Sequence, residues 1–342
     1  MRSTRPRKHF SLQKRKLFFV LPVYNDWNSL ERLVTEISSL DSNFQLYFTI
    51  VDDCSSEFDK EILDRIKMRC AKAGQHIEVL RLAMNRGNQF AIWVGLNYLY
   101  QLVDEKDLIL VMDSDGEDNP MDISKLLSAH RAGIPTVAKR GNRDSSLTFK
   151  LWHYAYKRIF KFITGENLDF GNFSVIDGLI LARILADESS NYVGYVGGLL
   201  SSSAKITRVP LNRGPRYHGK SKTSVHRLIQ WGLLQVSPFT DAIFSQSLKL
   251  SVKFTGICLG ASIVFLVLRV LEISVIPGWT SLFVSLALAI SFLLMIVTAM
   301  FLALFFILNT IRVKLKLSEP TDSQYSIKVK KFLADDSNNA QS

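Results

Sequence analysis

Two long apolar segments near the C-terminus constrain the fold of this chain more than any other feature of its sequence. They run from 254 to 276 and from 279 to 308, and the turn Pro277–Gly278 joins them. About 20 consecutive apolar residues are enough for a helix to cross the hydrocarbon layer of a bilayer. The alternative is a helical hairpin buried in a soluble core. The length of both segments favours two membrane-spanning helices.

Basic residues flank this hairpin at both of its ends. Lys249 and Lys253 precede the first segment, Arg312, Lys314 and Lys316 follow the second, and the connecting turn has no basic residue. Because positive loops stay on the cytoplasmic side, we predict that both ends, and hence the large N-terminal region, are cytoplasmic. The chain has 3 cysteines without metal-ligand spacing, which fits a reducing compartment.

The charge of the chain is strongly positive, with a formal net charge of +11. The basic residues cluster at 2–16, 139–161, 208–227 and 312–331. Nucleic acid is one partner for such patches. Anionic lipid headgroups fit better, because two of the clusters lie next to the apolar segments. We therefore expect a membrane partner and no nucleic acid.

The N-terminal region alternates between strand-like and helical patterns. Strand-like runs occur at 17–23, 46–51, 77–82 and 108–112, with helical patterns at 27–40, 57–73 and 89–103 between them. This alternation predicts right-handed βαβ units and a parallel sheet, an α/β fold. No G-x-G-x-x-G motif follows the first strand, which argues against a dinucleotide site of the Rossmann type.

The apolar run 108–112 ends abruptly in a series of carboxylates, Asp113, Asp115, Glu117 and Asp118. In open α/β sheets ligands bind at the carboxyl ends of the strands. Hard oxygen ligands suit Mg²⁺ or Mn²⁺, held by one or two carboxylates and a substrate diphosphate. An EF-hand starting at Asp113 is excluded, because its sixth and twelfth positions lack the required Gly and Glu. We expect Asp113 and Asp115 to bind the metal.

A helix is expected to begin directly after these acids. Asp118 or Asn119 is suited to be its N-cap, and Pro120 is suited to its first position, just before Met121. Capping of the helix by Asp118 or Asn119 is compatible with metal binding by Asp113 and Asp115.

Polar residues also follow the other predicted strands. Taken singly, each is more typical of a turn or a helix cap than of a ligand. Together with the acids at one sheet edge, they predict a nucleotide cleft. They are Pro22, Tyr24, Asn25 and Asp26 after the first strand, Asp52, Asp53, Ser55 and Ser56 after the second, and Asn85, Arg86 and Gly87 after the third.

Residues 214–221, GPRYHGKS, satisfy the pattern of a nucleotide-binding P-loop. A P-loop domain needs further βαβ units and a magnesium-holding acid downstream, and too little chain remains before the apolar segments. The cations Arg216, His218, Lys220 and Lys222 still suit phosphate oxygens. We therefore predict a phosphate-binding loop without P-loop hydrolysis.

Several stretches together resemble the family 2 glycosyltransferases of the GT-A fold. Within that family the chain is similar to the polyprenyl-phosphate glycosyltransferases, such as dolichol-phosphate mannose synthase and the bacterial GtrB type. The similarity extends from about residue 17 to 325 and includes the two-helix tail. It is carried by FVLPVYND, IVDDCSSE, RLAMNRGNQFAIWVGL, VMDSDGEDNP, GNFSVI, RYHGKSK and the hairpin containing GWTSL.

This resemblance implies roles for individual residues on the donor side. The nucleotide end of a sugar donor would be held by Pro22, Tyr24, Asp26 and Asp53. Asp113 and Asp115 correspond to the D-x-D motif, which binds the donor and the metal. Glu117 stands where the family usually has Gln beside the metal, so the implied metal set is Asp113, Asp115 and Glu117.

On the acceptor side, the resemblance implies that basic residues hold a lipid phosphate. These are Arg140, Lys150, Arg216 and Lys222. Asp169 matches an acidic position that orients the acceptor or acts as a base, and it is the second catalytic candidate beside Asp115. The chain departs from the family pattern at Gly116, Asn119, Asn172 and Lys220.

The implied function is that of a membrane-bound inverting glycosyltransferase. It would move a sugar from a UDP- or GDP-sugar to a polyprenyl phosphate such as undecaprenyl phosphate, with Mg²⁺ or Mn²⁺, for modification of a cell-surface glycan or lipopolysaccharide. Its place would be the bacterial inner membrane. The alternatives are a nucleotide-binding membrane scaffold without turnover and a polysaccharide synthase, although the Q-x-x-R-W motif of the latter is absent. Homo-oligomer formation stays open.

The expected organisation follows from these assignments. A basic tail (1–16) precedes the GT-A domain (17–222). Interfacial amphipathic helices (223–247), with Trp231 at the membrane surface, lead into the transmembrane region (248–311). A cytoplasmic tail (312–342) ends the chain.

Overall fold

A computed structural model of the chain describes most of the residues that carry these predictions. The described residues are 15–40, 43–140, 154, 157–158, 160–162, 164–165, 167–186, 194–202, 205–218, 239–271, 278–318 and 330–332. The chain divides into two compact units. The first comprises 1–153, 168–238 and 326–342, and the second comprises 154–167 and 239–325.

The first unit is a mixed α/β structure. Its strands are β1 (Arg15–Val23), β2 (Phe44–Asp52), β3 (His76–Arg81), β4 (Leu108–Val111), β5 (Thr136–Arg140), β6 (Phe170–Asp177), β7 (Thr207–Leu211) and β8 (Lys330–Phe332). Its helices are α1 (Trp27–Ser38), α2 (Lys60–Lys72), α3 (Asn88–Tyr100), the 3₁₀ helix η1 (Pro120–Asp122), α4 (Ile123–Ala129), α6 (Gly178–Ala186) and α8 (Tyr195–Ser202). The elements predicted up to β4 are all present.

The strands form one 8-stranded sheet in the order β7-β5-β6-β4-β1-β2-β3-β8. The strands β4, β1, β2 and β3 are parallel, as predicted. Two strands outside this predicted part run the other way: β6 is antiparallel to both β4 and β5, and β8 is antiparallel to β3. Every residue of β6 is buried, and the sequence of a strand does not reveal the direction in which that strand enters a sheet.

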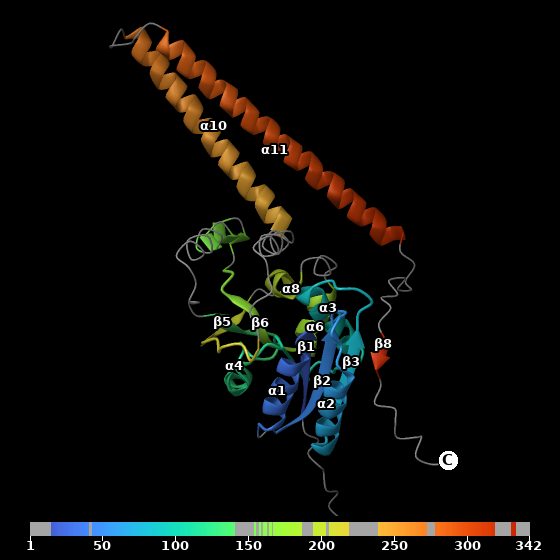
Figure 1. Cartoon of the computed structure of the whole chain (residues 1–342). Helices are drawn as coiled ribbons and strands as arrows, with labels where there is room; N and C mark the ends of the chain where they lie inside the picture. Colours follow the sequence, from blue (N-terminus) through green and yellow to red (C-terminus); the bar gives the residue numbers. More distant parts are fainter. Residues whose placement is uncertain are drawn as a thin grey trace, which may run out of the picture. The chain divides into compact units, whose positions relative to one another are not determined.

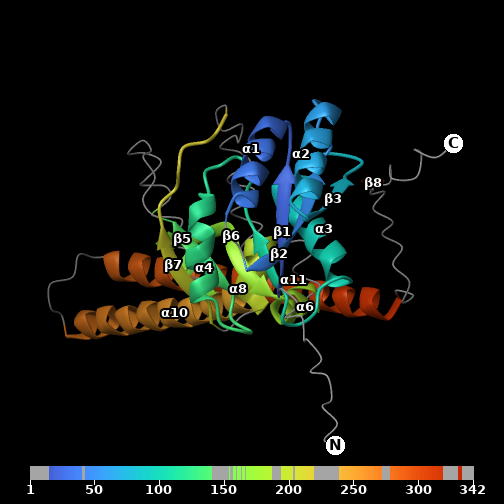
Figure 2. The same cartoon turned by 90° about the horizontal axis from the view of Figure 1, so that it is seen from below.

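Helices cover both faces of this sheet (Figures 1 and 2). Alternate residues of β1 point to opposite faces, as a strand requires. Leu17, Phe19 and Leu21 belong to the core cluster that also contains buried residues of α1, α2 and α4. On the other face, buried residues of α3 form a second cluster with β2 and β3. The carboxyl ends of β1, β2, β3 and β4 therefore meet at one edge of a sheet that is packed from both sides.

A glycine allows α3 to approach the sheet closely. A Cβ added at Gly95 would lie 2.7 Å from Cγ1 of Val20 and 3.0 Å from Cγ2 of Val51. Both valines are 0% exposed, so neither has free space to move into. This contact fixes the height of α3 over β1 and β2, and with it the place of the residues at the N-terminus of α3.

The second unit contains two long helices, α10 (Thr240–Val270) and α11 (Trp279–Ser318), which pack against each other. Both are long and apolar enough to cross a membrane, over Ala242–Val270 and Ser281–Phe301. The first helix begins upstream of the predicted span, because 240–247 are helical and continuous with it. Residues 223–238, including Trp231, lie outside the described residues.

We predict that Gly95→Val destabilises the first unit. The added side chain meets Val20 and Val51, and overpacking of this kind costs about 1–3 kcal/mol, more than the few tenths of a kcal/mol that Val gains over Gly in a helix. The unfolding temperature of the full chain in detergent should fall by about 5 °C.

The matched control is Asn97→Val on the same helix. The Asn97 side chain is half-buried and bonds only within its own turn, to the Trp93 carbonyl at 3.0 Å. Its replacement should leave the unfolding temperature within about 2 °C of the parent. Equal shifts for the two variants would contradict the packing argument.

Candidate functional site

The acidic turn, which we define as Asp113–Asp118, follows β4 directly at the carboxyl edge of the sheet. Most of it is buried, since Asp115, Glu117 and Asp118 are 9%, 8% and 6% exposed. The Asn119 side chain accepts the N–H of Met121 at 3.0 Å, with Pro120 as the first residue of η1. The predicted capping is thereby confirmed, with Asn119 as the cap. Carboxylates buried at this density require compensating partners.

Asp113 is held by neutral amides. Its Oδ1 accepts the side-chain N–H groups of Asn88 and Asn172, each at 2.9 Å. The side-chain oxygen of Asn172 accepts a hydrogen bond from Nε2 of Gln89 at 2.8 Å, and the side-chain oxygen of Gln89 accepts one from the backbone N–H of Tyr195 at 2.9 Å. The network joins Asp113 to α3, β6 and α8. Sequence reasoning noticed Asn172 only as a departure from a family pattern and did not assign it this contact.

Asp115 and Glu117 are held by arginines. Nη2 of Arg216 lies 2.6 Å from Oδ2 of Asp115, and its Nε lies 2.9 Å from Oε1 of Glu117. Arg213 forms a further ion pair with Glu117. Arg216, predicted at the acceptor phosphate, contacts the acidic turn in this structure. Arg213 was not predicted at all, although the proximity of a basic and an acidic motif in the sheet topology is the signal that could have found it.

The electrostatics of the turn favour bound cations. Burial raises the pKa of Asp115, and the neighbouring charge of Asp113 raises it further, to about 6, despite the opposing effects of the Glu117 N–H and Arg216. Burial lowers the pKa of Arg216, but Glu117, Asp115 and Asp26 more than offset this and raise it. Arg216 is therefore a permanent cation facing a carboxylate that is costly to ionise.

The donor set fits a divalent cation in part. Asp113 and Asp115 are hard oxygen donors on one turn, and one or two carboxylates plus substrate phosphates are what Mg²⁺ or Mn²⁺ requires. Within the described part of the chain, no group of three acidic, His or Cys side chains is arranged to hold a metal. The predicted set with Glu117 as third ligand is not assembled in this arrangement, because Glu117 is engaged by two arginines.

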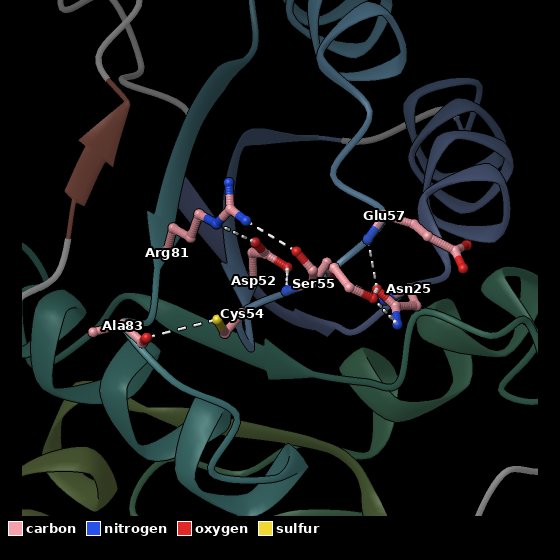
Figure 3. A network of polar contacts seen from close by, with 8 residues as sticks. Asn25, Asp52, Cys54, Ser55, Glu57, Arg81 and Ala83 are labelled. Atoms are coloured by element: carbon pink, nitrogen blue, oxygen red, sulfur yellow. Dashed lines mark hydrogen bonds and ion pairs between the residues drawn. The ribbon is translucent and has the colours of Figure 1, made fainter.

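A second polar network joins the carboxyl ends of β1, β2 and β3 (Figure 3). The backbone N–H of Asn25 donates to Oγ of Ser55 at 2.8 Å, and the N–H of Ser55 donates to Asp52 at 3.0 Å. Arg81 pairs with Asp52 at 3.1 Å and donates to the Ser55 carbonyl at 2.9 Å. Asn25 and Cys54 have positive φ angles of 49° and 58°. These contacts hold two strained turns at the predicted nucleotide edge.

Asp53 fixes the loop that leads into α3. Its two carboxylate oxygens accept the backbone N–H groups of Arg86 and Gly87, each at 2.7 Å. The other predicted donor residues lie on the same edge. Pro22 is buried at the end of β1, and Tyr24 beyond it is 43% exposed.

Asp169 lies just before β6, between two cations. Its carboxylate is 2.9 Å from Nε of Arg208 and 3.9 Å from Nζ of Lys139. Of the remaining acceptor candidates, Arg140 ends β5, and Lys150 and Lys222 lie outside the described residues. The structure therefore brings together Asp26, the acidic turn and Arg216. Because two of the four predicted acceptor-binding residues lie outside the described residues, it does not describe where these four would meet.

Comparisons with known proteins point to one family. The family model described as Glycosyl transferase family 2 matches residues 18–188. Two relatives are named undecaprenyl-phosphate 4-deoxy-4-formamido-L-arabinose transferase. The one from Edwardsiella ictaluri is 27% identical over 61% of this chain and 63% of its own length. The one from Salmonella choleraesuis is 26% identical over 78% of this chain and 80% of its own length.

Among solved structures, the chain is similar to glucosyl-3-phosphoglycerate synthase from Mycobacterium tuberculosis in complex with Mn²⁺, UDP-glucose and phosphoglyceric acid. The sequences are 14% identical, the TM-score is 0.47, and the match covers 67% of this chain and 80% of that one.

We predict that Asp53→Asn loosens the loop before α3. A carboxylate accepts two backbone N–H groups at once, whereas an amide accepts with one end only and leaves the other N–H facing an NH₂ group. The loss should be about 2 kcal/mol. Hydrogen exchange at the Arg86 and Gly87 amides should become faster, and the unfolding temperature should fall.

Asp59→Asn is the control for this substitution. Asp59 caps α2 through one oxygen, which accepts the Ile62 N–H at 3.0 Å, and Asn serves equally well as an N-cap. Unchanged exchange at Arg86 and Gly87 in the Asp53 variant would show that this bidentate contact does not hold the loop.

Proposed function

Because the chain belongs to glycosyl transferase family 2, we propose that it transfers a sugar from a nucleotide-sugar to a polyprenyl phosphate. The GT-A fold and the enzyme class, a glycosyltransferase, agree with the prediction from the sequence. The observation that carries the proposal is the acidic turn at the carboxyl edge of the sheet, with Asp113 and Asp115 beside the polar ends of β1 and β2. The relatives named for undecaprenyl phosphate support this acceptor.

The donor would bind along this edge. Pro22, Tyr24, Asp26 and Asp53 are our candidates for the nucleoside, whether the donor is a UDP-sugar or a GDP-sugar. Asp113 and Asp115 would hold Mg²⁺ or Mn²⁺, which when bound neutralises charge on the leaving diphosphate. The amides of Asn88 and Asn172 keep Asp113 in one orientation for this task.

The acceptor would need positioning more than activation. A phosphate monoester has a second pKa near 6 and is largely ionised at neutral pH, so it attacks without a strong base. Arg140, Lys150, Arg216 and Lys222 are our candidates for holding it in line with the sugar. A single displacement at the anomeric carbon predicts inversion.

Asp169 is better suited to orient than to take a proton. Its carboxylate is 2.9 Å from Nε of Arg208 and 3.9 Å from Nζ of Lys139, so it is placed to orient these two cations. Among the two roles considered from the sequence, this contact favours orientation of the acceptor or of the cations that bind it.

The membrane is where such an acceptor resides. The two candidate spans and the flanking basic residues support a membrane-bound enzyme with its first unit on the cytoplasmic side. We place it in the bacterial inner membrane, where it would modify a cell-surface glycan or lipopolysaccharide.

The central test is Asp115→Asn. Membranes containing the full chain are incubated with a panel of radiolabelled nucleotide-sugars and extracted with organic solvent. The parent should move label from one donor into the lipid phase, and the variant should lose at least about 100-fold of that rate, since it removes a charge that stabilises the leaving group.

Asp122→Asn is the matched control. Asp122 is an acid of η1 whose carboxylate pairs with the exposed Lys125 at 2.7 Å, and its loss should change the rate by about twofold or less. Undiminished transfer by the Asp115 variant, or no donor labelling the lipid phase, would refute the proposal and favour a scaffold without turnover.

The orientation is tested by labelling single cysteines in intact cells. In a background with Cys54, Cys70 and Cys258 replaced by Ala, Ser281→Cys lies at the start of α11 and Lys60→Cys on the surface of the first unit. A membrane-impermeant maleimide should label the first and spare the second until the cells are opened. The reverse pattern would place the first unit outside.

A further inference from the structure

The segment after β7 lies across the acidic turn. We name residues 212–218 the arginine segment, since it contains Arg213 and Arg216. Its backbone makes two hydrogen bonds to the turn: the N–H of Gly214 donates to the Glu117 carbonyl at 2.8 Å, and the N–H of Tyr217 donates to the Asp115 carbonyl at 2.9 Å. The segment therefore contacts the turn at more than one residue and runs along it.

The side-chain contacts of this segment are shielded from water. The Arg213 and Arg216 side chains are 25% and 27% exposed, and the Asp115 and Glu117 side chains 13% and 10%. Hydrogen bonds between ionised partners are about twice as strong as neutral ones. These ion pairs thus hold the segment more firmly than exposed surface pairs do.

A third contact anchors the segment at a distance from the acids. The Tyr217 hydroxyl donates to Oε2 of Glu36 on α1 at 2.5 Å, and the Arg32 guanidinium lies 4.1 Å from the centre of the Tyr217 ring. The ring also packs over Gly116, where an added Cβ would overlap it. Gly116 therefore has two roles: it adopts the positive φ of 82° that the turn requires, and its lack of a side chain leaves space for the Tyr217 ring.

Arg216 and a divalent cation would compete for one atom. Oδ2 of Asp115 is 2.6 Å from the guanidinium, and Oδ1 accepts the N–H of Glu117 at 3.0 Å, so both oxygens of Asp115 are already engaged. A cation bound there would also repel both arginines at close range. A metal ion at Asp115 would therefore push the arginine segment away from the acidic turn.

We propose that the arginine segment is a latch that closes the acidic turn when no metal and donor are bound. Metal binding opens it and frees Arg213 and Arg216 for anionic oxygens of the substrates. This inference rests on the proposed function, because it needs Asp115 to be a metal ligand. The alternative is a fixed structural ion pair, with the metal bound by other oxygens.

A latch has a measurable consequence for metal affinity. The apparent affinity of a ligand falls by the fraction of molecules that are competent to bind. If the latch is closed in about nine molecules of ten, its release strengthens binding by about tenfold. A fixed ion pair with the metal elsewhere predicts no such gain.

The experiment measures Mn²⁺ binding to the full chain in detergent by the electron paramagnetic resonance signal of free Mn²⁺, with saturating UDP or GDP and against a protein-free blank, because the diphosphate supplies the oxygens that the two carboxylates lack. The key variant is Tyr217→Phe, which removes the bond to Glu36 and changes no charge near the turn. It should bind Mn²⁺ about threefold more tightly than the parent, and Arg213→Gln should bind it about tenfold more tightly.

Lys125→Gln is the control for charge alone. Lys125 is an exposed cation of α4 that pairs with Asp122, not with the acidic turn. Its loss should alter Mn²⁺ binding by less than about twofold. The latch would be overturned if Tyr217→Phe and Arg213→Gln, the two latch variants, gained no more Mn²⁺ affinity than Lys125→Gln. Unchanged Mn²⁺ affinity in Tyr217→Phe would also overturn it.

Hydrogen exchange provides an independent readout of the movement. The amides of Gly214 and Tyr217 should exchange slowly without metal and faster with saturating Mn²⁺. Unchanged exchange while Mn²⁺ is bound would overturn the latch.

Asp115→Asn separates the two levels of the proposal. If Mn²⁺ binding depends on Asp115 but not on the latch variants, the metal site stands and the latch fails. If Mn²⁺ binds neither the parent nor the latch variants, or binds independently of Asp115, the metal site of the proposed function fails, and the latch fails with it.

Discussion

The burial of several carboxylates at the end of one strand is the constraint on which the rest of the site depends. A carboxylate removed from water costs several kcal/mol unless charge or hydrogen bonds compensate it. Asp115 and Glu117 are both less than 10% exposed. Other parts of the chain therefore supply donors: the segment after β7 supplies them to Asp115 and Glu117, and α3 and β6 supply them to Asp113.

The edge formed by β1, β2 and β3 meets the same constraint with permanent contacts. Burial raises the pKa of Asp52, in spite of its bonds to Ser55 and its pairing with Arg81. Asp53 uses both oxygens on backbone N–H groups. Because these partners belong to strands and to the loop before α3, the edge is rigid before any ligand arrives, which reduces the entropy that a nucleotide loses on binding.

The sequence predicted those features that depend on neighbours in the chain. The strands up to β4, the helices between them, the acidic turn and the cap at Asn119 follow from local patterns and turn chemistry. It did not predict the direction of β6, because its eight residues are all buried and apolar content carries no direction. Nor did it predict Arg213 on Glu117 or Asn172 on Asp113, since these pairs are brought together only by the order of strands in the sheet. The prediction of Glu117 as a metal ligand used the local motif alone, which does not contain the two arginines that pair with it.

Asp113 and Asp115 differ in how easily their hydrogen-bond partners can be exchanged. Asp113 is bound by amides from α3 and β6, two elements packed within the fold, and movement of either would disturb the core. Asp115 is bound by a side chain from a segment that follows β7, the last strand at one edge of the sheet. Movement of that segment breaks ion pairs and two backbone bonds but leaves the strand order intact. The exchange of a guanidinium for a metal ion proposed above would need one fixed ligand and one releasable ligand, and the topology provides Asp113 and Asp115 with these two kinds of partner.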